Sequence, residues 1–160
     1  MPPMADRPVR PTRVADVYLR SPGPRGRARI RWPAAADRTA AMVVVLSPPS
    51  GVGLTGLVDR LVDQVDAVVL TVPVAHVIEA HAALTWAADH AGDLGADPDR
   101  LAVVGVGSGA ALAERVAELA ADEGWPPLRQ VALIWPHDDP GAALVRLAAA
   151  LSRPPVEPTR

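Results

Sequence analysis

Three continuous apolar runs constrain the fold of this chain more than any other feature. They are Met42–Leu46, Leu101–Val104 and Ala67–Val72, the last of which is interrupted only by Thr71. Runs without alternating polar residues are typical of strands buried on both faces, which occur mostly in parallel sheets covered by helices. The segments between these runs repeat apolar residues at helical spacing, so strands and helices alternate. The sequence therefore predicts an α/β fold with a mostly parallel, doubly wound sheet.

The remaining elements follow from similar patterns. Turn-forming residues at Ser21–Gly26 separate two short β-prone segments, which predicts an N-terminal antiparallel hairpin of Val14–Leu19 and Ala28–Trp32. A turn is expected at Asp97–Arg100 and a last strand at Val131–Trp135, which gives about six strands. The expected helices are residues 54–65, Val77–Leu94, Ser108–Glu123 with Leu112, Val116 and Leu119 on one face, and Pro140–Leu151.

Length and composition favour one domain, which we place at residues 14–152. Proline-rich segments at residues 1–13 and 153–160 are expected to be flexible tails. The chain is 49% hydrophobic and has a net charge of -2, so its charge gives no reason to expect a nucleic-acid partner. No apolar run approaches the ~20 residues that span a bilayer, and the N-terminus lacks the pattern of a signal peptide. We therefore expect a cytoplasmic protein without a membrane partner.

Missing residue types exclude several chemistries. Lysine and cysteine are absent, and this rules out a Schiff base, a thiol nucleophile, an iron–sulfur cluster and a disulfide. Of the four histidines, His76, His81 and His90 lie in or beside one predicted helix, with no pair four residues apart. Such spacing is unsuited to a metal pair on a helix, so we predict no metal and no cofactor. The bias towards Ala, Arg, Pro, Val and Gly is typical of a GC-rich bacterial genome.

Four local strings occur in the order found in one enzyme family. They are RIRWPA at Arg29–Ala34, ALTWAADHAGDLG at Ala83–Gly95, DPDRLAVVG at Asp97–Gly105 and PPLRQVALIWP at Pro126–Pro136. Over about residues 14–136 the chain resembles the hormone-sensitive-lipase-like esterase branch of the α/β-hydrolases. The resemblance implies that the turn after Leu101–Val104 corresponds to the sharp G-x-S-x-G turn that presents a nucleophilic serine.

The nucleophile position of that turn is filled by glycine. Gly105 and Gly109 hold the two glycine positions, and Gly107 stands at the centre, where it has no side chain to attack a carbonyl. The resemblance also implies an H-G-G-G oxyanion loop after the first buried strand. This chain instead has Ser47-Pro48-Pro49-Ser50, and proline has no N–H to donate.

Two further parts of the family pattern are missing. The active-site segment expected after Val72 is shortened to Pro73-Val74-Ala75, and the stretch after Pro136 has room for one helix but not for the family's last strands with their acid and histidine. The resemblance therefore implies a C-terminally truncated α/β-hydrolase-like domain.

Three other interpretations concern this glycine-rich turn and the segment after the last predicted strand. Ser108 could act as a displaced nucleophile if the turn bulged, whereas in the simpler interpretation it caps the following helix. Residues Gly105–Ala110 also match G-x-G-x-x-G/A, which indicates a dinucleotide- or anion-binding turn, although no acidic residue follows at the usual spacing. The sequence His137-Asp138-Asp139 could supply a base and an acid, or Asp could cap the next helix.

The main functional hypothesis is a pseudoenzyme with an interaction or scaffolding role. The alternatives are a serine esterase acting through Ser108, with a partner chain completing the site, and a small-molecule or nucleotide-binding module using Gly105–Ala110. If Val131–Trp135 forms a sheet edge, the last helix, a second copy or a hydrolase-like partner is expected to cover it.

Overall fold

The computed structural model describes residues 13–18, 27–33, 40–48, 55–135 and 138–152. Its strands are β1 (Val14–Tyr18), β2 (Arg27–Arg31), β3 (Ala40–Ser47), β4 (Ala67–Pro73), β5 (Ala96–Val106) and β6 (Gln130–Ile134). Its helices are α1 (Thr55–Val65), α2 (Val77–His90), α3 (Ser108–Glu123) and α4 (Pro140–Ser152). The expected tails fall almost entirely outside the described residues, so the domain limits of 14–152 stay a prediction.

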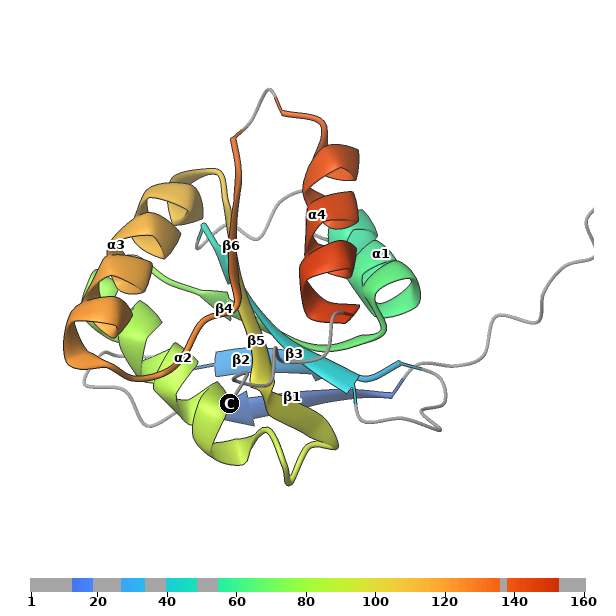
Figure 1. Cartoon of the computed structure of the whole chain (residues 1–160), viewed down its shortest axis with the longest axis horizontal. Helices are drawn as coiled ribbons and strands as arrows, with labels where there is room; N and C mark the ends of the chain where they lie inside the picture. The colour runs from blue at the N-terminus through green and yellow to red at the C-terminus, as the bar shows by residue number, and fades with distance from the viewer. Residues whose placement is uncertain (1–12, 19–26, 34–39, 49–54, 136–137, 153–160) are drawn as a thin grey trace, which may run out of the picture.

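All six strands form one sheet in the order β1-β2-β4-β3-β5-β6 (Figure 1). Strand β3 lies between β4 and β5 and is parallel to both, and β6 is parallel to β5. The hairpin β1–β2 is antiparallel and joins the sheet through antiparallel pairing of β2 with β4. The predicted fold class is therefore confirmed, including its hairpin.

Two helical layers cover the sheet, with α2 and α3 on one face and α1 and α4 on the other (Figure 1). Every residue of β3 is buried, because alternate side chains enter the two cores. Met42, Val44 and Leu46 pack on the α2–α3 side, and Val43 and Val45 pack on the α1–α4 side. Among the helices that the structure describes, none has the length and apolar character needed to cross a membrane.

Three local expectations need correction. The turn expected at Asp97–Arg100 is an irregularity inside β5: the register with β3 jumps from Ala41–Asp97 to Met42–Leu101, and the Asp97 carboxylate accepts the Asp99 N–H at 2.9 Å. Helix α2 ends at His90 rather than at residue 94.

The buried face of α3 is also different from the one expected. It consists of small residues and one valine, namely Gly109, Ala110, Ala113, Val116 and Ala120, whereas Leu112 and Leu119 are only partly buried. Small residues let the helix approach the sheet closely, so size rather than hydrophobicity selects the contact face. This close approach also determines how α3 begins.

Candidate active site

The turn between β5 and α3 is the centre of the candidate site. Its apex is Gly107, with φ 59° and ψ −124°, a conformation that residues with a side chain adopt only under strain. The Gly107 N–H donates to the Ile134 carbonyl oxygen at 2.9 Å, and its own carbonyl accepts the Ala110 N–H at 3.0 Å. The sharp strand–turn–helix geometry is therefore present, with glycine at its apex.

Close backbone approach explains the two flanking glycines. A Cβ at Gly105 would overlap the Gly109 carbonyl oxygen and the Cα of Ala110. A Cβ at Gly109 would overlap the Leu46 carbonyl oxygen at the end of β3. Both positions therefore need glycine for packing, and this accounts for the G-x-G-x-x-G/A match without a bound nucleotide.

The space around the apex position differs from the space around the two flanking glycines. Among the described residues, a Cβ at Gly107 would meet only Pro48 Cγ, at 3.4 Å, which is ordinary van der Waals contact. The described part of the chain thus leaves room for a side chain at position 107, and none of its residues requires glycine there by crowding.

A proline, Pro48, directly follows β3 and lies next to this apex. Ser47 is buried, and its carbonyl oxygen accepts the Val74 N–H at 3.1 Å, which joins the ends of β3 and β4. The next residue, Pro48, lies within contact distance of the apex position and has no N–H. An oxyanion on a group at the apex would find no donor at residue 48. Residues 49–54, with Pro49, lie outside the described part of the chain.

Ser108 is the first residue of α3 and is exposed to solvent. The helix N-cap is Gly107, so the interpretation of Ser108 as the capping residue is wrong. Ser108 follows the apex and does not replace it. Its candidacy as a nucleophile stays a prediction.

The described histidines have structural contacts away from the turn. The His90 ring stacks on Trp86 with centroids 4.4 Å apart, and its Nδ1 lies 2.8 Å from the Trp86 carbonyl oxygen. His81 Nε2 lies 3.4 Å from a Glu123 carboxylate oxygen, between α2 and the end of α3. His76 is exposed just before α2, and His137 lies outside the described residues. Within the described ranges, no group of three metal-ligating side chains occurs.

Asp139 caps the next helix, as the sequence offered as an alternative, and Asp138 holds the turn before it. Asp139 Oδ1 accepts the Gly141 N–H at 2.9 Å in the first turn of α4. Asp138 Oδ2 accepts the Trp135 N–H at 3.0 Å and holds the turn after β6. Their carboxylates are therefore used by backbone groups of this connection.

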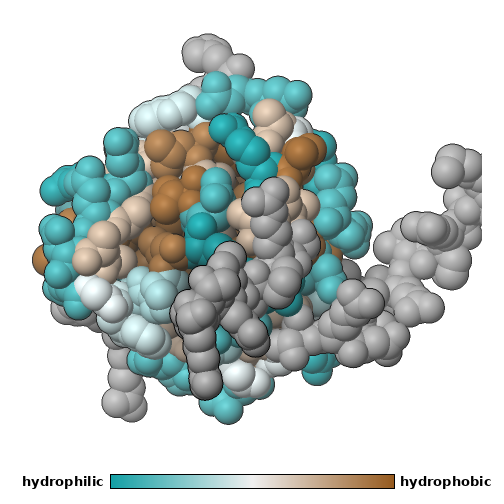
Figure 2. All heavy atoms as spheres, in the orientation of Figure 1, coloured by the Kyte–Doolittle hydropathy of each residue, from teal (hydrophilic) through white to brown (hydrophobic). Residues whose placement is uncertain are grey.

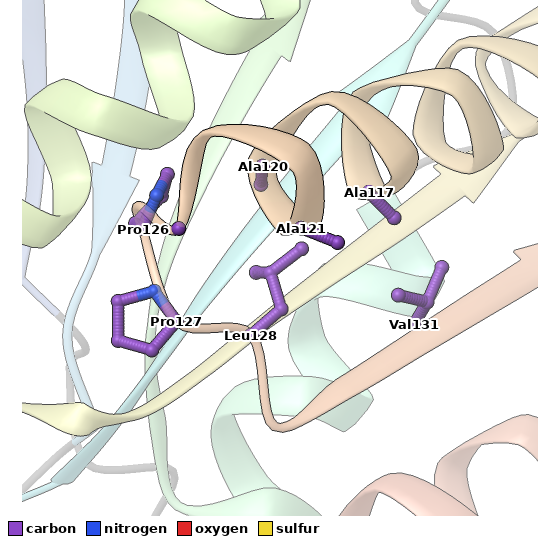
Figure 3. A pocket seen from close by; sticks show the side chains of 8 residues that line it. Ala117, Ala120, Ala121, Pro126, Pro127, Leu128 and Val131 are labelled. Carbon is purple, nitrogen blue, oxygen red and sulfur yellow. The ribbon is translucent and has the colours of Figure 1, made fainter.

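Sequence analysis missed an open apolar groove of about 330 Å³ at the other end of α3 (Figure 3). It lies between the end of α3 and the segment that leads into β6. The Leu128 side chain points towards Ala121 across the groove (Figure 3). The signal in the sequence was faint: small residues on the helix, followed by a proline turn. The lining residues are Ala117, Ala120, Ala121, Gly124, Pro126, Pro127, Leu128 and Val131.

Comparison with known proteins agrees with this geometry. A family described as the alpha/beta hydrolase fold matches residues 55–155. Esterase LipI of Mycobacterium tuberculosis is 34% identical over an alignment of 139 positions, which covers 76% of this chain and 43% of that protein. Carboxylesterase NlhH of the same organism is 43% identical over 54 residues, or 34% of this chain and 17% of that protein.

Two solved esterase structures are also similar to most of this chain. The carboxylesterase EstE1 from a metagenomic library superposes with a TM-score of 0.68 at 29% identity and covers 78% of this chain and 47% of its own. An esterase of the archaeon Pyrobaculum calidifontis gives a TM-score of 0.64 at 29% identity, over 74% of this chain and 43% of its own. The chain thus spans less than half the length of each of these relatives. Its sheet, its glycine-flanked turn and the family match together establish that this chain belongs to the α/β-hydrolase fold family, on the esterase-like branch.

Proposed function

We propose that this chain is a non-hydrolytic member of the family, a pseudoenzyme with an interaction role. One observation carries the proposal: the apex of the strand–helix turn is Gly107. A nucleophilic mechanism needs an oxygen or sulfur atom at this point, and glycine supplies neither. The surrounding backbone keeps the strained-turn geometry although no side chain uses it.

The environment of the apex supports the same conclusion. Among the described residues, the nearest group to the apex position is the ring of Pro48, directly after β3, which cannot donate to an oxyanion. Loss of one such donor typically lowers kcat by about 10²–10³. His81 and His90 contact Glu123 and Trp86, so neither is held at the apex as a general base.

A second candidate is an esterase that uses Ser108. Its hydroxyl is exposed and lies at the first residue of α3, where the partial positive charge of the helix N-terminus favours an alkoxide. Activity by this route requires a base from elsewhere, such as a partner chain. A third candidate, an anion- or nucleotide-binding module at Gly105–Ala110, is less favoured because packing accounts for its glycines. We place the protein in the cytoplasm, as its sequence predicts.

Hydrolysis of short p-nitrophenyl esters separates the first two candidates. The wild-type chain and a Ser108→Ala variant are compared at equal concentration, with a family esterase as positive control. We expect the wild-type chain and Ser108→Ala to hydrolyse the ester at the same low rate, which is the rate of nonspecific catalysis by surface groups. Burst kinetics or turnover that disappears in Ser108→Ala would contradict the proposal and support the esterase.

A further inference from the structure

The apolar groove beside the end of α3 lies outside the candidate active site, and we call it the α3–β6 groove. Ala117 and Ala121 belong to its helical wall, and Leu128 and Val131 belong to the opposite wall (Figure 3). Its volume of about 330 Å³ is at the small end of the range for binding pockets. A groove of this size and lining suits one or two apolar side chains of a partner.

A row of carboxylates runs along α3 next to this groove. Glu114, Glu118 and Asp122 follow one another at intervals of four residues and are exposed, and we call them the acidic row. Neighbours on a helix surface are three or four residues apart, so Glu114 lies beside Ala117 and Glu118 lies beside Ala121. The acidic row therefore borders the helical wall of the groove.

The negative charge of the acidic row is largely uncompensated in the described part of the chain. Like charges four residues apart on a helix repel each other. Helix α3 has four acidic residues and one basic residue, Arg115. Within the described ranges, no ion pair involves a carboxylate of the acidic row. Figure 2 shows hydrophilic residues along the outer side of α3 and apolar residues between α3 and α4. The acidic row is therefore open to a cationic partner.

The combination of an apolar groove and an acidic border selects the class of partner. Nucleic acids and anionic membranes carry negative charge, which the acidic row repels. A small polyamine would match the carboxylates but would bring no side chain for the apolar groove. A protein segment with basic and apolar residues on one face matches both features.

We propose that the α3–β6 groove binds a helical segment of a partner protein that carries Arg or Lys at intervals of four residues beside apolar residues. Its apolar side chains enter the groove between Ala121 and Leu128, and its basic side chains lie over the acidic row. The repeat of the basic residues matches that of the acidic row because both follow helical geometry. This partner deepens the interaction role proposed above, and the proposal rests on that role.

Binding of a synthetic peptide to the full chain tests the proposal. The probe is a fluorescein-labelled, alanine-based helical peptide with arginines at intervals of four residues and leucines beside them on the same face. Its titration is followed by fluorescence anisotropy. We expect saturable binding to the wild type that weakens as salt is added, because salt screens charges at the exposed rim. The same peptide with glutamine in place of each arginine should bind at least about tenfold more weakly.

Two variants with matched controls separate the charge from the groove. Glu118→Arg reverses the charge at the centre of the acidic row, and Asp63→Arg makes the same change of net charge at an exposed position of α1, on the other face of the sheet. Ala121→Gln fills the groove with a polar side chain and keeps the net charge, and Ala142→Gln is its control at an exposed position of α4. We expect Kd to rise at least about tenfold in Glu118→Arg and Ala121→Gln, and to change by less than about twofold in the two controls.

Circular dichroism checks that each variant is folded. A wild-type chain without saturable binding would overturn the proposal. Equal weakening in Asp63→Arg would show that only net charge attracts the peptide, and unchanged binding in Ala121→Gln would show that the groove is not used, so either result would overturn it too. These outcomes do not depend on ester hydrolysis, so the docking site and the proposed loss of catalysis fail separately.

Discussion

The backbone N–H of Gly107 donates to the carbonyl oxygen of Ile134 at a distance of 2.9 Å. This bond ties the apex of the β5–α3 turn to the last residue of β6. The turn that defines the candidate site and the last strand of the described sheet are therefore parts of one unit.

The flanking glycines of the turn should be far less tolerant of substitution than an open glycine. In Gly105→Ala and Gly109→Ala, the new Cβ overlaps backbone atoms that have no room to move, so each variant should lose about 1–3 kcal/mol or more. Gly56→Ala in α1 is the control, since nothing lies within 4 Å of its Cβ. It should be neutral or more stable by up to about 1 kcal/mol. Thermal unfolding of the three variants measures the difference, and equal melting temperatures would contradict the packing argument.

The apex should accept a side chain at a moderate cost. Gly107→Ser and Gly107→Ala should each destabilise the chain by about 1–3 kcal/mol, because the cost arises from the backbone conformation at positive φ and not from overlap with described residues. Gly107→Ser should fold and still fail to turn over esters, since none of the described residues holds a base at the apex. Melting temperature and ester hydrolysis are measured together. Turnover in Gly107→Ser above that of Gly107→Ala would reveal a base that this account lacks.

Helix α4 should be an integral part of the domain. Leu147 is fully buried against the sheet, so Leu147→Ala should lower the free energy of unfolding by about 2–5 kcal/mol. Val145 on the same helix is 70% exposed and provides the matched control, with an expected change within about 0.5 kcal/mol. Urea denaturation measures both, and an unchanged midpoint for Leu147→Ala would show that α4 does not hold the core.

The cap of α4 should contribute measurably to stability. Asp139→Ala removes the acceptor of the Gly141 N–H and should cost about 0.5–2 kcal/mol. Asp139→Asn keeps an acceptor oxygen and should retain most of that stability. If both variants unfolded at the same denaturant concentration as the wild type, the carboxylate would have no capping role.

Patterns repeated along the sequence predicted most of the fold. Buried strands such as β3 are recognised because their apolar runs are long, and the hairpin because its turn residues separate two short segments. The contact face of α3 was predicted wrongly from Leu112 and Leu119, since hydrophobic spacing does not reveal that Gly109 must lie against the Leu46 carbonyl. Close packing of this kind depends on how elements meet in space.

The candidate site was predicted only in part, because some of its features also depend on how elements meet in space. The identity of Gly107 is visible in the sequence, but its positive φ and the approach of Pro48 are tertiary facts. The α3–β6 groove depends on a helix end, a proline turn and a strand start that periodicity does not place relative to one another. The exposure of Trp135 likewise follows from the end of β6 and the turn held by Asp138.

Intact-mass spectrometry after incubation with a fluorophosphonate probe tests the central claim, that this turn carries no nucleophile. The probe forms a covalent adduct with activated serine hydroxyls regardless of the acyl specificity of the enzyme. The account predicts an unmodified wild-type mass while a family esterase in the same tube is fully labelled. A stoichiometric adduct on the wild type that is lost in Ser108→Ala would contradict it.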